Sequence, residues 1–117
     1  MAVSATRTTT IVFTGDVTGT ETIPAATNAA AAGAIEIKTL SSGANTITVP
    51  TGGTVPTAVV IVPPAGNANL LTLKGITGDT GVALHKTDPT TVALDSTVVN
   101  FVINAAATVT GVRLYWT

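Results

Sequence analysis

Residues 57–64 have the sequence TAVVIVPP, and this stretch decides the fold class. Its middle part is continuously apolar, and its valines and isoleucine are stiff at χ1 and favour extended backbone. Pro63 and Pro64 end the run, because proline lacks the N–H group that a sheet ladder requires. The stretch therefore predicts a central β-strand that is covered on both faces.

Short runs of the same kind continue outward in both directions, separated by turn residues. In residues 34–40, AIEIKTL, Ile35 and Ile37 alternate with Glu36 and Lys38, which predicts a half-buried strand. Further strands are expected at 10–14, 17–23, 46–50, 69–75, 81–85, 90–95, 97–104 and 108–116. A series of short strands spaced by about 8–12 residues is typical of a sandwich or barrel. The chain is therefore predicted to be all-β, a single-domain antiparallel β-sandwich or barrel.

The composition supports this fold class and sets the domain organisation. The chain has 117 residues, enough for one domain with a modest core, and 25 of them are Thr. Residues 1–10 are small and polar and are expected to form a flexible N-terminal arm, with the β-domain at 11–117. The Ala-rich segment 24–34 is predicted to be a loop or a single helical turn, because helix nucleation is unfavourable at this length.

Charge is scarce, which argues against several classes of partner. Charged residues make up 9% of the chain against roughly 25% in ordinary soluble domains, and the net charge is −1. The five cations are scattered along the sequence: Arg7, Lys38, Lys74, Lys86 and Arg113. A nucleic-acid partner is not expected, since such proteins concentrate Lys and Arg in one patch. With a mean hydropathy of +0.54, much of the surface is expected to be covered by other protein chains.

Membrane and redox signals are also lacking in the sequence. No apolar run reaches 18 residues and no apolar leader is evident near residue 1, so no membrane partner is expected. Cysteine is absent, which removes disulfides and thiolate metal sites and leaves the redox compartment undetermined.

The tripeptide Asp79-Thr80-Gly81 allows two interpretations. An aspartic protease needs two carboxylates that share a proton, and a dimer could supply one from each chain. In such enzymes, however, the tripeptide directly follows an apolar strand, whereas Thr77 and Gly78 precede it here. Glycines on both sides of Asp-Thr are typical of a tight turn, and the turn is the favoured interpretation.

His85 is the only histidine, and it invites a metal or catalytic hypothesis. A metal site needs three or four ligands, and the six carboxylates are dispersed along the chain. No serine lies in a Gly-x-Ser-x-Gly elbow that would make it a nucleophile. His85 is therefore predicted to bond to a turn at a strand end, and no enzyme activity, cofactor or metal is expected.

Six residues are the candidates for an interface. Trp, Tyr and Arg are enriched at interface hot spots, and Arg113, Tyr115 and Trp116 end the last strand together. The alternative, that Trp116 only closes the core, is equally open. Arg7, Ile11 and Phe13 are added because an N-terminal segment can pair with the sheet of a neighbour.

Residues 73–95, LKGITGDTGVALHKTDPTTVALD, and 99–116, VNFVINAAATVTGVRLYW, resemble small structural proteins of tailed-bacteriophage virions. Those proteins are short, cysteine-free β-domains rich in Ala, Thr, Gly and Val. The resemblance rests on this amino-acid composition and on the Gly-Asp-Thr-Gly…Leu-His…Pro-Thr run. The N-terminal third of the chain carries no matching motif.

The resemblance implies a capsid decoration, or cement, protein. Such proteins sit on the assembled head, commonly as homotrimers at local three-fold positions, and brace neighbouring major capsid subunits. The expected partner is then the phage major capsid protein, and the expected location is the capsid surface of the virion after synthesis in the host cytoplasm. Two alternatives remain, a tail or baseplate accessory protein and a carbohydrate-binding or adhesin-type sandwich.

Overall fold

The structure is a computed structural model of the chain, and it describes residues 4–15, 19–28 and 32–117. All regular structure in these ranges is β-strand, which confirms the predicted all-β class. The strands are β1 (Ala5–Phe13), β2 (Gly19–Asn28), β3 (Ile35–Leu40), β4 (Gly43–Thr48), β5 (Ala58–Val62), β6 (Leu71–Lys74), β7 (Val82–Ala83), β8 (Thr90–Ala93), β9 (Asn100–Ala105) and β10 (Val109–Trp116).

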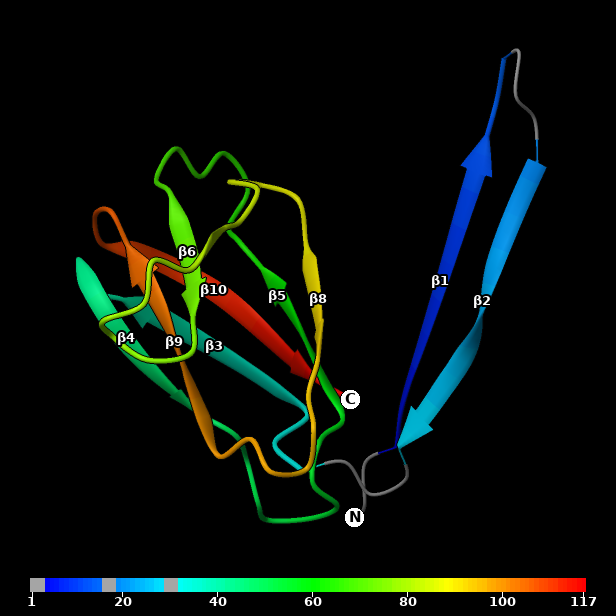
Figure 1. The fold of residues 1–117 in the computed structure, drawn as a ribbon, viewed down its shortest axis with the longest axis horizontal. Helices are drawn as coiled ribbons and strands as arrows, with labels where there is room; N and C mark the ends of the chain where they lie inside the picture. The colour runs from blue at the N-terminus through cyan, green and yellow to red at the C-terminus, as the bar shows by residue number, and fades with distance from the viewer. Residues whose placement is uncertain (1–3, 16–18, 29–31) are drawn as a thin grey trace.

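Two four-stranded antiparallel sheets pack face to face as a sandwich (Figure 1). Sheet I has the strand order β3-β10-β5-β8, and sheet II has the order β4-β9-β6-β7. From β3 to β10, every connection except that between β6 and β7 crosses from one sheet to the other. Neighbours in a sheet are therefore mostly distant in the sequence.

Strand β5 lies in the interior of sheet I, as its sequence predicts. Val59 and Ile61 point inward and are fully buried. Val60 and Val62 point outward and are only half-buried. The sequence predicted that both faces of this strand would be buried, but in the structure its outward face is only partly buried.

The core is formed by side chains from the inner faces of both sheets. Trp116 of β10 and Phe101 of β9 meet across the sandwich with ring centroids 6.2 Å apart and a tilt of 56°, a favourable aromatic geometry. Other fully buried members are Leu40, Ile47, Val59, Ile61, Leu71, Ile103, Val112 and Leu114. The sequence left the role of Trp116 open, and its 1% exposure places it in the core rather than on an interface.

A bulge at Gly111 aligns β10 with this core. The pairing register between β10 and β3 shifts between Thr110 and Val112, and Gly111 has a φ of 85°. The extra residue lets Val109 and Val112 both point inward, although strict alternation would place them on opposite faces. Only glycine takes this backbone conformation without a steric penalty.

Strand β3 is half-buried as expected, but the face that it buries is the opposite of the one its pattern suggests. Ile35 and Ile37 are 60% and 70% exposed, whereas Glu36 and Lys38 are on the side of the sandwich. The reason is tertiary: β3 is an edge strand, Leu40 fills the core, and Glu36 binds the indole of Trp116. Because Glu36 faces the core side to bind Trp116, the alternation of β3 places Ile35 and Ile37 on the outer face.

The first two strands form a separate antiparallel hairpin that projects away from the sandwich (Figure 1). Strands were expected at 10–14 and 17–23; in the structure they extend back to Ala5 and forward to Asn28. Residues 24–28, which were predicted to be loop or helical turn, therefore continue a strand, and that prediction is wrong for them. Strand β1 also runs across residue 10, the expected boundary of the arm. Residues 1–3 of the predicted arm, 17 and 18 of the predicted strand, and 29–31 of the Ala-rich segment lie outside the described part of the chain.

Candidate functional site

The Asp79 carboxylate is used to build a turn. Its Oδ2 accepts hydrogen bonds from the backbone N–H groups of Gly75 (3.1 Å) and Ile76 (3.0 Å), between β6 and β7. The backbone N–H of Asp79 donates to the carbonyl of Ile76 at 3.1 Å. Gly81 has a φ of 78° and so reverses the chain into β7. The turn interpretation of Asp79-Thr80-Gly81 is confirmed, and the carboxylate already has two donors.

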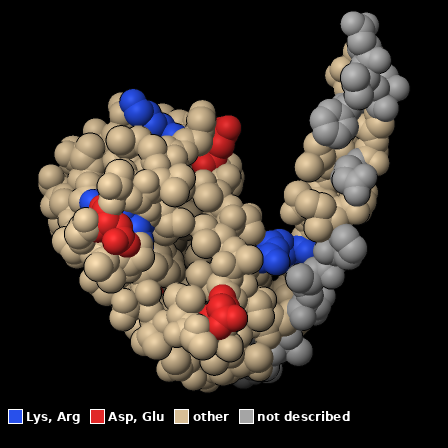
Figure 2. Space-filling view, in the orientation of Figure 1, with Lys and Arg blue, Asp and Glu red and all other residues tan. Residues whose placement is uncertain are grey.

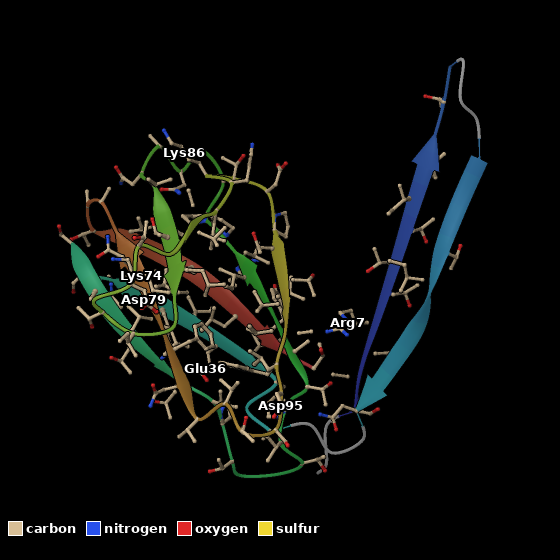
Figure 3. All side chains as sticks on the ribbon, in the orientation of Figure 1. Arg7, Glu36, Lys74, Asp79, Lys86 and Asp95 are labelled. Carbon is tan, nitrogen blue, oxygen red and sulfur yellow. The ribbon has the colours of Figure 1, made fainter. Side chains whose placement is uncertain are left out.

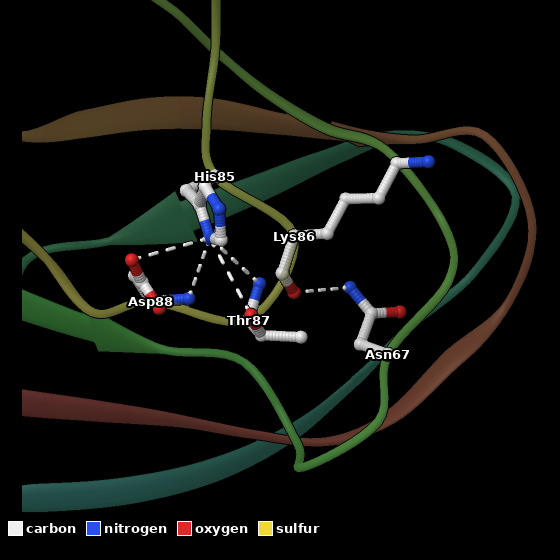
Figure 4. A network of polar contacts seen from close by, with 5 residues as sticks. All are labelled: Asn67, His85, Lys86, Thr87 and Asp88. Atoms are coloured by element: carbon white, nitrogen blue, oxygen red, sulfur yellow. Dashed lines mark hydrogen bonds and ion pairs between the residues drawn. The ribbon is translucent and has the colours of Figure 1, made fainter.

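His85 organises the next turn, shown in Figure 4. Its Nδ1 accepts hydrogen bonds from the backbone N–H groups of Asp88 (2.9 Å) and Thr87 (3.3 Å). Asn67 ties the same turn to the β5–β6 loop by donating to the Lys86 carbonyl at 2.8 Å. His85 is therefore a turn residue, as expected.

The described residues hold no group of three or more His, Asp or Glu side chains placed to bind a metal ion. In the same part of the chain, no helix has the length and apolarity that crossing a membrane requires.

The outer face of sheet I carries a row of apolar side chains that are exposed or half-buried. Register places Ile35, Tyr115 and Val60 side by side across three strands, with Ile37, Arg113 and Val62 in the next row. Ile35 and Ile37 are exposed, and Tyr115, Val60 and Val62 are half-buried. We call these six residues, together with Thr91 of β8, the sheet I face. Its cation, Arg113, is exposed and makes no ion pair with any described residue.

A notch separates the sandwich from the hairpin, as the space-filling view shows (Figure 2). At its base lies a hollow of about 540 Å³ lined from both sides, by Thr6 and Arg7 of β1 and by Val60 and Tyr115 of sheet I. The Arg7 side chain extends from β1 into this space (Figure 3). Its Nη1 atom is buried and has no hydrogen-bond partner among the described residues.

The hairpin itself exposes branched apolar side chains. Ile11 is 42% exposed, Ile23 is 47% and Val12 is 62%. The base of the hairpin is fixed to the sandwich by Asn28, which is 8% exposed and donates to the Val55 carbonyl at 3.2 Å. Phe13 belongs to β1, but its side chain lies outside what the structure describes.

A second apolar region lies at the sheet II end of the molecule. Ile76 in the β6–β7 turn, Val82 in β7 and Val99 before β9 are each 66% exposed. Beside them, a hollow of about 630 Å³ is lined by Leu73, Val82 and Val92 from both sheets. Exposed apolar residues therefore occur on separate surfaces and not in one patch.

The structure brings some of the predicted interface residues together and removes others. Arg113 and Tyr115 share the sheet I face, Arg7 lies across the notch from it, and Ile11 is farther along the hairpin. Ile35, Ile37, Val60 and Val62 are surface residues that were not among the predicted interface candidates. A usable signal existed for Trp116, because Val112, Leu114 and Trp116 alternate with Arg113 and Tyr115, which puts the tryptophan on the apolar side.

Comparisons with protein-family models, curated proteins and solved structures gave no match to this chain.

Proposed function

We propose that this protein is a non-enzymatic virion structural protein that decorates and stabilises a phage capsid by bridging neighbouring major capsid subunits. The observation that supports this role best is the distribution of exposed apolar side chains over several surfaces. The sheet I face, the hairpin and the sheet II end each expose branched side chains. One such surface fits one partner, whereas several fit a protein with neighbours on several sides.

The scarcity of charge supports the same role. On the face drawn in Figure 2, only a few groups of Lys, Arg, Asp and Glu interrupt a surface made by other residues. A free monomer normally stays soluble through a charged surface without large apolar patches. A chain with 9% charged residues meets that requirement better when other chains cover its apolar surfaces.

The physical mechanism is the addition of many weak contacts. Each exposed side chain contributes a modest free energy when it is buried, and symmetry repeats the contact over a lattice. Because one decoration protein contacts more than one capsid subunit, separation of the subunits requires all of these contacts to break together. The result is resistance of the shell to internal pressure without any chemical step.

Electron microscopy of capsids that lack the protein, mixed with purified protein, tests the proposal. We expect saturable density at local three-fold positions of the capsid lattice. Two variants test whether the sheet II end contacts the capsid. Val82→Lys places a charge on that exposed end, and Thr80→Lys, the matched control, adds the same charge in the neighbouring turn. Absence of binding to capsids at saturating protein would contradict the proposal, and binding to tails alone would favour a tail or baseplate accessory role.

An enzymatic role for Asp79 is the competing function from a different class. Asp79→Asn keeps an oxygen that can accept the two backbone hydrogen bonds of the turn but removes the charge a protease dyad needs. We expect this variant to fold and to bind capsids like the unchanged protein. A peptidase activity that is present in the unchanged protein and lost in the variant would overturn the structural role.

A further inference from the structure

No other described strand covers the β1–β2 hairpin. β1 pairs with β2, and neither strand pairs with any strand of the two sheets. Ile11 and Ile23 lie on one face of the hairpin. Ile23 is paired with Thr9, and Thr9 lies two residues before Ile11 in β1, so all three side chains are on the same side. An isolated two-stranded hairpin is at best marginally stable in water, so a further surface must pack against it.

The sheet I face is an apolar surface that likewise lacks a cover. Ile35 and Ile37 form its most exposed edge at 60% and 70%, next to half-buried Tyr115, Val60 and Val62. Burying such side chains contributes about 25 cal/mol per Å² of apolar area removed from water. The hairpin of the same chain approaches this face only at its base, across the notch (Figure 1).

We propose that the sheet I face binds the β1–β2 hairpin of a second copy of this chain, through the Ile11 and Ile23 side of that hairpin. Each copy carries one uncovered hairpin and one uncovered face, so self-association covers both in equal numbers. β1 and β2 have 9 and 10 residues and β10 has 8, so the strands on the two sides of the contact are of similar length.

Polar groups at the contact favour the same occupant. Arg113 is the charged residue of the sheet I face and has no ion-pair partner among the described residues. The buried Nη1 of Arg7 at the foot of the notch also needs an acceptor. Among the described strands, β1 and β2 pair only with each other, so an incoming hairpin presents backbone carbonyl groups along its outer edges as well as apolar side chains.

The contact is compatible with closed assemblies. Two copies can exchange hairpins reciprocally, or each hairpin can bind the next copy around a ring. In either arrangement, the sheet II end with Ile76 and Val82 stays free for another partner. The inference does not rest on the capsid role, because it concerns only copies of this chain.

Mixed crosslinking of two single-cysteine variants tests the contact directly. The chain has no cysteine, so Ile23→Cys and Ile37→Cys each add one thiol at an exposed position. When the two variants are mixed and treated with a short bismaleimide, we expect a crosslinked product joining residues 23 and 37 of different chains. Two matched controls each replace one member of this pair. Val12→Cys, on the other side of the hairpin, is mixed with Ile37→Cys, and Ile76→Cys, at the sheet II end, is mixed with Ile23→Cys. Each control mixture should give at least tenfold less crosslinked product.

Light scattering supplies the second measurement. We expect the unchanged protein to be an oligomer of the 11.6 kDa chain, and Ile37→Lys or Ile23→Lys to weaken association at least tenfold. Ile76→Lys, at a site that is 66% exposed, should leave association unchanged, and the fluorescence of buried Trp116 should show that all variants fold. A monomer at every concentration, or crosslinking of 37 to 37 in place of 23 to 37, would overturn the inference.

The two proposals fail separately. A monomer that still binds capsids removes the hairpin contact and leaves the capsid role intact. An oligomer that gives the 23-to-37 crosslink but binds no capsid removes the capsid role and leaves the hairpin contact intact.

Discussion

The indole nitrogen of Trp116 donates a hydrogen bond to Oε1 of Glu36 at 2.9 Å, joining two residues 80 positions apart in the sequence. Trp116 is 1% exposed, so its N–H has little access to water and requires an acceptor. The other carboxylate oxygen of Glu36 lies 3.2 Å from Nζ of Lys38. This arrangement explains why β3 presents its polar residues to the sandwich and its isoleucines to the outside.

Removal of the acceptor should destabilise the protein more than removal of the charge. Glu36→Leu leaves the buried indole N–H without a partner, at a cost of about 1–3 kcal/mol in the free energy of unfolding. Glu36→Gln keeps an acceptor oxygen and loses only a partly exposed ion pair, worth about 0–1 kcal/mol. Urea unfolding followed by the fluorescence of Trp116 measures both. Equal losses in the two variants would show that the hydrogen bond contributes little.

The inverted orientation of β3 can be tested with two isoleucines of sheet I. Ile61 is fully buried, so Ile61→Ala should lower the free energy of unfolding by about 2–5 kcal/mol. Ile37 is 70% exposed, so Ile37→Ala should change it by no more than about 0.5 kcal/mol. The measurement belongs at protein concentrations below any self-association, because Ile37 contributes to the proposed contact. A loss at Ile37 as large as that at Ile61 would mean that β3 buries its isoleucines.

The elements that the sequence predicts well are those with local causes. The apolar run before Pro63 predicts an interior strand, and the glycines around Asp79 predict a turn, because these residues act on their own backbone. The same holds for His85, whose partners are two and three residues away.

Long-range contacts decide the features that the sequence did not reveal. The outward direction of Ile37 depends on the bond between Glu36 and Trp116, and the extension of β2 to Asn28 depends on its pairing with Ala5. Local propensity favoured a loop for the Ala-rich segment, but cross-strand hydrogen bonds with β1 prevailed over it for residues 24–28. The candidate surface was only partly predictable for the same reason: alternation shows which residues share a face, but not which face the rest of the chain covers.

Two glycines of the β6–β7 turn should respond oppositely to alanine. Gly81 has a φ of 78°, and a Cβ there would lie 2.5 Å from the Leu73 carbonyl oxygen. Gly81→Ala should therefore cost at least about 1–2 kcal/mol from the left-handed conformation alone. Gly78 has open space around its Cβ position and no positive φ, so Gly78→Ala should be neutral or stabilising by up to about 1 kcal/mol. Thermal unfolding of both variants decides; similar effects would mean that the turn is not built as described.

Asp95 should give a small acid-dependent contribution with a defined sign. Its Oδ1 accepts hydrogen bonds from the backbone N–H of Thr97 at 2.9 Å and from the Thr97 hydroxyl at 2.7 Å. These bonds favour the charged form and lower the pKa of Asp95 below its usual value of 3.8, the backbone bond having the larger effect. Because the folded pKa is the lower one, the stabilisation is present above the unfolded pKa and is lost as the pH falls through the folded pKa. Thr97→Val removes the hydroxyl and keeps the backbone donor, so an NMR titration should show the Asp95 pKa moving part of the way back up. A pKa of Asp95 that stays the same in the variant would mean that the hydroxyl does not stabilise the carboxylate, and the backbone N–H alone would then account for the shift.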